Sequence, residues 1–123
     1  MVTCYDYWSA IIIDQSNLDA VLVGDSSAMV MHGHKTTVNA DVQMLAFHTS
    51  AVSRGIKEKF IVVDLPFLSH LKGRSHLLDN VDILFKAGAN AIKIEGADNS
   101  VDDIEFLVNS GIPVMGHLGM TPQ

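Results

Sequence analysis

Residues 88–96, Gly-Ala-Asn-Ala-Ile-Lys-Ile-Glu-Gly, carry the pattern that decides the fold of this chain. Residues 89–94 form a short, mostly apolar run that is followed directly by a carboxylate. Such a run is typical of a strand buried in a parallel sheet, since a half-exposed antiparallel strand would alternate apolar and polar residues. Lys93 and Glu95 are two residues apart, so on a strand they point to one side while the neighbouring isoleucines point to the other.

Similar apolar runs recur at residues 1–4, 20–23, 60–63 and 112–115, and segments with helical period lie between them. We expect Ser75 and Ser100 to cap two of these helices, the second in a capping box with Asp103. Helix ends with left-handed backbone are expected at Gly55, Gly88 and Gly111, and near Asn17 after a short helix at residues 8–14.

The regular alternation of strands and helices predicts an α/β fold with right-handed crossovers. Two architectures fit this order, a doubly wound sheet and a (β/α)8 barrel. The first strand runs into Tyr5-Asp6-Tyr7-Trp8 and not into the glycine-rich turn of a dinucleotide-binding unit, which favours the barrel. A complete barrel takes about 250 residues. We therefore predict that residues 1–123 form a single, incomplete TIM-barrel domain with about the first five strands.

Charge and composition exclude several classes of function. Of the 123 residues, 48% are hydrophobic and 18% are charged, as in an ordinary globular domain. A net charge of -6 argues against nucleic-acid binding, and no apolar run approaches the roughly 20 residues that span a bilayer. The single cysteine, Cys4, cannot form an internal disulfide and reads as a small core residue. We expect a cytoplasmic protein, with a mitochondrial location as the alternative if a targeting segment precedes residue 1.

Three carboxylates, Asp25, Asp64 and Glu95, follow successive predicted strands. Because the carboxyl ends of parallel strands meet at one edge of a sheet, we expect these side chains to lie close together. Carboxylates held together repel each other, so a hard divalent ion such as Mg²⁺ is a natural ligand for them. The alternative is that each is a solvated acid in a loop.

Three further residues at the strand ends are candidates for contact with a substrate. Lys93 could neutralise an anionic ligand, although a structural ion pair with Glu95 is about as plausible. Ser26 could donate to the same ligand or serve only its Gly-Asp-Ser-Ser turn. His117, flanked by glycines, could donate to a substrate oxygen or be satisfied by a neighbouring carbonyl. The sequence His32-Gly33-His34 lies in a predicted loop and not on a strand, which argues against a zinc site.

Taken together, the motifs resemble the ketopantoate hydroxymethyltransferase family. They are Thr3-Cys4-Tyr5-Asp6-Tyr7, Val23-Gly24-Asp25-Ser26, Gly33-His34, His48-Thr49-Ser50-Ala51-Val52, Asp64-Leu65-Pro66-Phe67, Gly88-Ala89-Asn90, Lys93-Ile94-Glu95-Gly96 and Gly116-His117-Leu118-Gly119-Met120-Thr121-Pro122-Gln123. The resemblance implies transfer of a hydroxymethyl group from 5,10-methylenetetrahydrofolate to 3-methyl-2-oxobutanoate, which gives 2-dehydropantoate on the route to pantothenate.

The resemblance also implies roles for particular residues. Asp25, Asp64 and Glu95 match the Mg²⁺ site of the family, and Ser26, Lys93 and His117 match positions near the oxoacid. Asp25 and Asp64 are expected to bind the substrate as well. The general base of the family is a glutamate that we expect beyond residue 123, and Asp98 has no motif that would support it as a substitute. The resemblance further implies a homo-oligomer for the full-length enzyme.

Three interpretations follow from the sequence. We favour a fragment of the hydroxymethyltransferase that lacks the general base and is inactive alone. The second is a half-barrel that binds Mg²⁺ and an oxoacid without turnover. The third is a Mg²⁺-dependent barrel enzyme of the phosphoenolpyruvate mutase and isocitrate lyase type. The motifs at residues 64–67 and 116–119 favour the first interpretation over the third.

Overall fold

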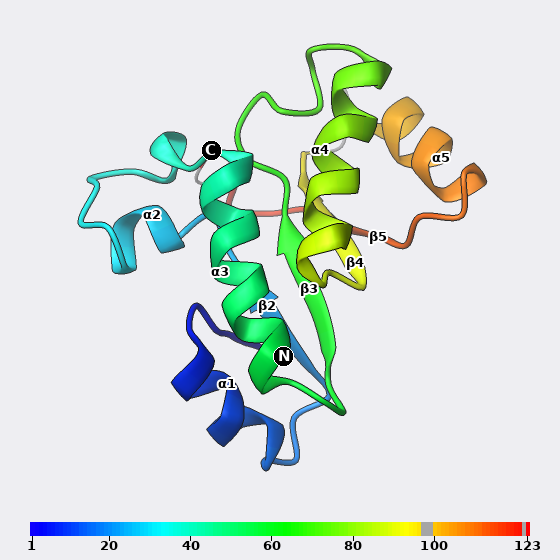
Figure 1. Cartoon of the computed structure of the whole chain (residues 1–123). Coiled ribbons are helices and arrows are strands. Elements are labelled where there is room, and N and C mark those ends of the chain that lie inside the picture. The colour runs from blue at the N-terminus through cyan, green and yellow to red at the C-terminus, as the bar shows by residue number, and fades with distance from the viewer. Residues whose placement is uncertain (97–99, 122) are drawn as a thin grey trace.

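The computed structural model describes residues 1–96, 100–121 and 123, so that Asp98 lies outside the described residues. Five parallel strands form one sheet (Figure 1): β1 (Val2–Thr3), β2 (Ala20–Val23), β3 (Phe60–Asp64), β4 (Ala91–Glu95) and β5 (Val114–His117). Their spatial order is β1-β2-β3-β4-β5, so each strand pairs with the next one in the chain. A doubly wound sheet would change direction within this order. The five predicted strands are confirmed, and their order is the one that a barrel requires.

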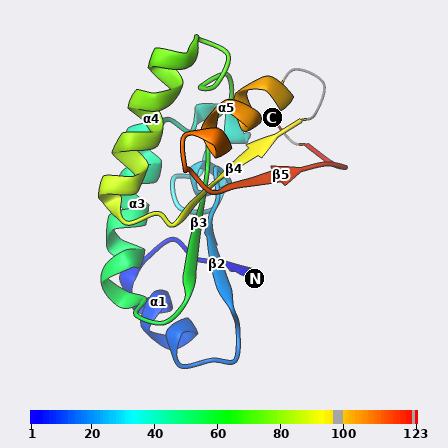
Figure 2. The same cartoon turned by 90° about the vertical axis from the view of Figure 1, so that its right-hand side faces the viewer.

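Four helices of at least two turns connect these strands: α1 (Tyr7–Asp14), α3 (Val42–Gly55), α4 (Arg74–Ala87) and α5 (Val101–Asn109). Figure 2 shows α1, α3 and α4 in a layer along one face of the sheet. A short helix α2 (Ser27–Val30) and a 3₁₀ turn η1 (Thr37–Asn39) lie in the connection from β2 to α3, and neither was expected. None of the helices in the described part of the chain combines the length and apolar character needed to cross a bilayer.

Alternation along the strands separates two kinds of residue. The residues that face the helix layer belong to the hydrophobic core, and in the three central strands they are Val21, Val23, Ile61, Val63, Ile92 and Ile94. The residues between them face the other side, where Leu22, Val62 and Ala91 lie in register across the sheet. On that same side, the next positions toward the carboxyl ends are Gly24, Asp64 and Lys93, two of which carry charged side chains. The apolar side therefore anchors the sheet to its helices and the other side carries the candidate site.

The helix starts differ from the sequence predictions. Asp41 caps α3, since its Oδ1 accepts from the backbone N–H of Met44 at 2.8 Å. Gly73 precedes α4, and Ser75 lies inside its first turn. Ser100 does precede α5, but its side chain makes no cap hydrogen bond, so the predicted capping box is wrong. Its hydroxyl lies 3.5 Å from the carbonyl of Glu95 instead.

The helix ends are a mixture of correct and incorrect predictions. Gly88 and Gly111 have positive φ angles of 114° and 84°, as expected. Asn17 does not have a positive φ angle. Gly55 is the last residue of α3, and its backbone is not left-handed either. A Cβ atom at Gly55 would lie 2.7 Å from the Cβ of Ala10, so this glycine allows α1 and α3 to approach closely.

Candidate active site

The candidate site lies at the carboxyl ends of β2 to β5, on the sheet side that faces away from α1, α3 and α4. Asp64 of β3 is in register with Lys93 of β4, and Glu95 of β4 is in register with His117 of β5. Asp25 follows β2 directly. The parallel register therefore brings together the side chains that the sequence placed at separate strand ends.

Lys93 lies between two buried carboxylates. Its Nζ is 2.6 Å from Oδ1 of Asp64 and 3.8 Å from Oε1 of Glu95. The lysine side chain is only 10% exposed, and the Asp64 side chain 4%. Burial raises the pKa of the Asp64 carboxyl above its ordinary value, and the Lys93 ammonium opposes that shift. The ion pair that we considered for Lys93 is present, but its shorter contact is with Asp64 and not with Glu95.

Asp25 is held against the same cluster through its backbone. Its amide N–H donates to Oδ2 of Asp64 at 3.1 Å, and the residue is 4% exposed. Gly24 leaves room at this turn, because a Cβ atom there would lie 2.7 Å from Oγ of Ser26 and 3.4 Å from Oδ2 of Asp64. The closest contact of such a Cβ is with Ser26 of the same turn, so the glycine of the Val-Gly-Asp-Ser motif leaves room mainly for the Ser26 hydroxyl.

Two residues that the sequence did not single out support the site. Gln123 donates through Nε2 to Oδ2 of Asp25 at 2.7 Å, across 98 residues of chain. The Tyr5 hydroxyl lies 2.8 Å from Oγ of Ser26. Ser26 is therefore engaged with a side chain from the loop after β1 and not only with its own turn. Both residues lie in motifs quoted above, but their partners are too distant in sequence for the motifs to identify them.

His117 and Glu95 form the far end of the cluster. Nδ1 of His117 lies 3.1 Å from Oε1 of Glu95, so the partner of the histidine is a carboxylate and not the carbonyl considered as the alternative. The other carboxylate oxygen, Oε2 of Glu95, is buried and has no hydrogen-bond partner among the described residues. An acceptor of this kind is costly to leave unsatisfied, and it marks a place where a donor or a cation would be stabilised.

This cluster suits a divalent cation in the type of its donors but not in the positions of its side chains. Its donors are carboxylate oxygens, which are the ligands that Mg²⁺ prefers, and one of them is the free Oε2 of Glu95. As the side chains lie, however, the described residues hold no group of three His, Cys, Asp or Glu side chains close enough to bind one ion. The Lys93 ammonium lies between Asp64 and Glu95. The donor set therefore suits the ion, whereas the positions of the described side chains do not form a site for it.

The histidine loop does not join the carboxylates. Nε2 of His32 lies 2.8 Å from Nε2 of His48 on α3, and Nδ1 of His48 lies 2.7 Å from the carbonyl of Tyr5. Because a carbonyl only accepts, Nδ1 of His48 carries the proton and its Nε2 accepts from His32. This pair ties the loop after α2 to α3 and to the loop after β1.

Cys4 is a core residue, as predicted. The side chain is 2% exposed and belongs to the hydrophobic cluster beneath the helices. Burial raises the pKa of its thiol, so the reactive thiolate is disfavoured.

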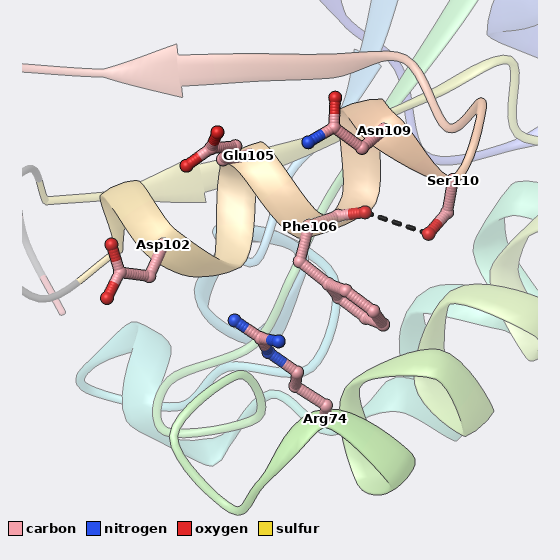
Figure 3. Close-up of a pocket in the computed structure, with 6 residues that line it drawn as sticks. All are labelled: Arg74, Asp102, Glu105, Phe106, Asn109 and Ser110. Atoms are coloured by element: carbon pink, nitrogen blue, oxygen red, sulfur yellow. Dashed lines mark hydrogen bonds between the residues drawn. The ribbon is translucent and has the colours of Figure 1, made fainter.

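A separate pocket of about 390 Å³ lies between the start of α4 and α5 (Figure 3), and it contains none of the predicted site residues. The Arg74 guanidinium stacks over the Phe106 ring at 4.6 Å from its centroid. Asp102, Glu105, Asn109 and Ser110 complete the lining. Among the described residues, no hydrogen bond joins the side chains that line this pocket to the predicted site residues at the strand ends.

Solved structures with the same arrangement define the class of fold. The structure resembles 2,3-dimethylmalate lyase, a member of the phosphoenolpyruvate mutase and isocitrate lyase superfamily, with a TM-score of 0.67 at 14% identity over 94% of this chain and 45% of that one. It also resembles phosphonopyruvate hydrolase in complex with oxalate and Mg²⁺, with a TM-score of 0.65 at 13% identity over 76% of this chain and 32% of that one. At these identities the likeness concerns the fold, which is that of a partial (β/α)8 barrel.

Sequence comparison identifies the family within that class. The ketopantoate hydroxymethyltransferase family matches residues 1–123, and the chain belongs to this family. It is 56% identical to the 3-methyl-2-oxobutanoate hydroxymethyltransferase of Legionella pneumophila (strain Paris) and 58% identical to that of Coxiella burnetii (strain Dugway 5J108-111). Each match covers 100% of this chain and 47% of the relative, so the chain spans about half the length of these curated relatives. The resemblance stated from the motifs is confirmed.

Proposed function

We propose that this chain supplies the metal- and oxoacid-binding part of an enzyme that transfers a hydroxymethyl group from 5,10-methylenetetrahydrofolate to 3-methyl-2-oxobutanoate. The product is 2-dehydropantoate. The observation that carries the proposal is the cluster of Asp25, Asp64, Lys93 and Glu95, with buried side chains, and the half-buried His117 at the strand ends, in a chain of this family. A cluster of buried charges at the carboxyl edge of a barrel is where such enzymes bind their substrates.

Asp25, Asp64 and Glu95 are the residues that would hold Mg²⁺. A divalent cation bound there supplies Lewis-acid polarisation of the keto and carboxylate oxygens of the oxoacid. Two observations support this assignment, the unpartnered Oε2 of Glu95 and the fold shared with a hydrolase whose structure contains oxalate, a small dicarboxylate, together with Mg²⁺. Three carboxylates and one ammonium leave two negative charges, which matches a divalent cation.

The remaining site residues would bind and orient the oxoacid. Lys93 can turn its ammonium from Asp64 toward the substrate carboxylate, which keeps it paired with a negative group in the buried site. The Ser26 hydroxyl, held by Tyr5, can donate to a substrate oxygen. Glu95 engages Nδ1 of His117, which leaves the other ring nitrogen without a hydrogen bond among the described residues and able to bind the ligand. Removal of the C3 proton has no residue assigned to it in this chain, so we expect binding of the oxoacid without turnover.

Titration calorimetry tests this function on the chain itself. We expect 3-methyl-2-oxobutanoate to bind only when Mg²⁺ is present, and Asp64→Asn to abolish that binding. The matched control is Asp82→Asn, since Asp82 is an exposed acid on α4 whose ion pair among the described residues is with the exposed Lys86. Binding of the oxoacid that is equal with and without Mg²⁺, or that survives in Asp64→Asn, would refute the assignment.

A second measurement tests the expectation that none of the 123 residues acts as the general base. When the folate co-substrate is added, we expect no product from the chain alone, and product formation would show that the base lies among these 123 residues. The likeness to the mutase and lyase superfamily supports the shared fold and no particular reaction, and it therefore does not favour the third interpretation. A homo-oligomer and a cytoplasmic location remain parts of the proposal, and the mitochondrial alternative stays a prediction.

A further inference from the structure

Gln123 reaches from the segment after β5 back to the ends of β2 and β3. Its Nε2 donates to Oδ2 of Asp25 at 2.7 Å and to the carbonyl of Leu65 at 3.2 Å. A side-chain amide has two N–H groups, and here each of them has an acceptor. If the amide were turned over, its oxygen would face a carboxylate and a carbonyl, which is unfavourable on both sides. The orientation of the Gln123 amide is therefore fixed by its two partners.

Asp25 depends on this contact more than the other two carboxylates of the cluster depend on theirs. Lys93 lies within 4.0 Å of both Asp64 and Glu95 but forms no such pair with Asp25 among the described residues. Asp25 is nonetheless only 4% exposed, so water can do little to replace the ion pair that its carboxylate lacks. For the Asp25 side chain, the hydrogen bond found within the described chain is the one from Gln123. The rotamer of a buried carboxylate is set by the donors that it meets.

We propose that Gln123 is a positioning residue, which fixes the Asp25 carboxylate in the cluster while leaving its charge in place for a cation. The proposal rests on the proposed function and adds to it the residue that orients one ligand. A lysine at this position would also bind Asp25, but it would cancel one of the two negative charges that a divalent ion requires. A neutral amide orients the carboxylate and keeps the charge.

Mg²⁺ titration of the wild type and three variants tests the proposal. Gln123→Leu leaves Asp25 and the Leu65 carbonyl without a donor, and we expect Mg²⁺ to bind about tenfold more weakly, or worse. Gln43→Leu makes the same change at an exposed position in the first turn of α3, and we expect no change in affinity. If leucine is too bulky beside Asp25, Gln123→Ala removes the same donor. Equal Mg²⁺ affinity in the wild type and both Gln123 variants would overturn the proposal.

A measurement without metal keeps the positioning separate from the proposed function. NMR couplings that report the χ1 angle of Asp25 are expected to show one rotamer in the wild type and in Gln43→Leu, and an average over rotamers in Gln123→Leu. A single Asp25 rotamer in Gln123→Leu would overturn the positioning role, whatever the metal data show. Failure of the wild type to bind Mg²⁺, with Asp25 disordered in the variant, would instead refute the metal assignment and retain Gln123 as the group that orders Asp25.

Discussion

Replacing Lys93 with methionine tests the electrostatics of the site most directly. The change removes the ammonium that lies 2.6 Å from Asp64 and 3.8 Å from Glu95, and it keeps a side chain of similar length. Removing one partner of a buried ion pair typically costs about 3 to 5 kcal/mol, because the remaining charge stays buried without compensation. Since small domains have a free energy of unfolding of about 5 to 15 kcal/mol, Lys93→Met should remove a large part of the stability of the chain.

The chain contains a matched control for this change. Lys86 lies 2.6 Å from Asp82, the same distance as Lys93 from Asp64, but its side chain is 75% exposed. Exposed pairs four residues apart on a helix contribute about 0.3 to 0.5 kcal/mol, so Lys86→Met should cost no more than that. The two variants therefore share the ion-pair distance and differ in burial. Urea denaturation of both proteins, followed by circular dichroism, gives the two free-energy differences.

The effect of Lys93→Met should also depend on pH in a defined direction. Burial already raises the pKa of Asp64 above its ordinary value, and Lys93 holds it down in part. Without the lysine the pKa rises further, so the folded state binds a proton that the unfolded state releases. A group with a raised folded pKa stabilises the fold below its unfolded pKa and loses that contribution as pH rises through the folded pKa. The destabilisation should thus be largest at neutral pH and shrink toward pH 4. A loss below about 1 kcal/mol, or one that is the same at both pH values, would refute this reasoning.

Three further changes, and one control substitution, have expected outcomes in the same denaturation assay. Gly55→Ala should cost about 1 to 3 kcal/mol because its Cβ would lie in contact with α1, whereas Gly116→Ala, with nothing within 4 Å, should change stability by less than about 0.5 kcal/mol. His48→Leu should cost about 1 to 3 kcal/mol, since it leaves the Tyr5 carbonyl without its donor; a cost near zero would mean that water replaces the imidazole. Asp6→Ala should cost about 1 kcal/mol at pH 7 as a lost helix cap. Because a backbone N–H lowers the pKa of Asp6, that difference should persist above the ordinary carboxyl pKa and vanish as pH falls through the lowered value.

The parts of the fold that local sequence controls were predictable. The strands were predicted correctly because short apolar runs with β-branched residues are typical of buried strands. The two-residue spacing of Lys93 and Glu95 correctly placed both side chains on the site side of β4. The helix α2 was missed because four residues are too few to show a helical period. The cap of α4 was misplaced because Ser75 follows Gly73 closely, and sequence alone does not say at which residue the backbone turns into the helix.

The candidate site was predictable in composition but not in its contacts. Motifs and strand ends identified the three carboxylates. The register of the sheet brings these strand ends side by side. The contacts of Gln123 with Asp25 and of Lys93 with Asp64 depend on which side chains meet across strands, and no spacing in the chain encodes that. The roles assigned to these residues toward metal and oxoacid stay predictions until binding is measured.

The sequential order of the strands also sets how the chain can fold as it leaves the ribosome. Each strand pairs with the one made just before it, as Phe60 does with Ala20 and Ala91 with Val62. Among these five strands, each newly made strand therefore finds the neighbour that precedes it already present. Domains assembled in this order can begin to form their structure during synthesis. The carboxylates would then be buried one after another, beginning with Asp25, and the last hydrogen bond of the cluster to close would be the one from Gln123.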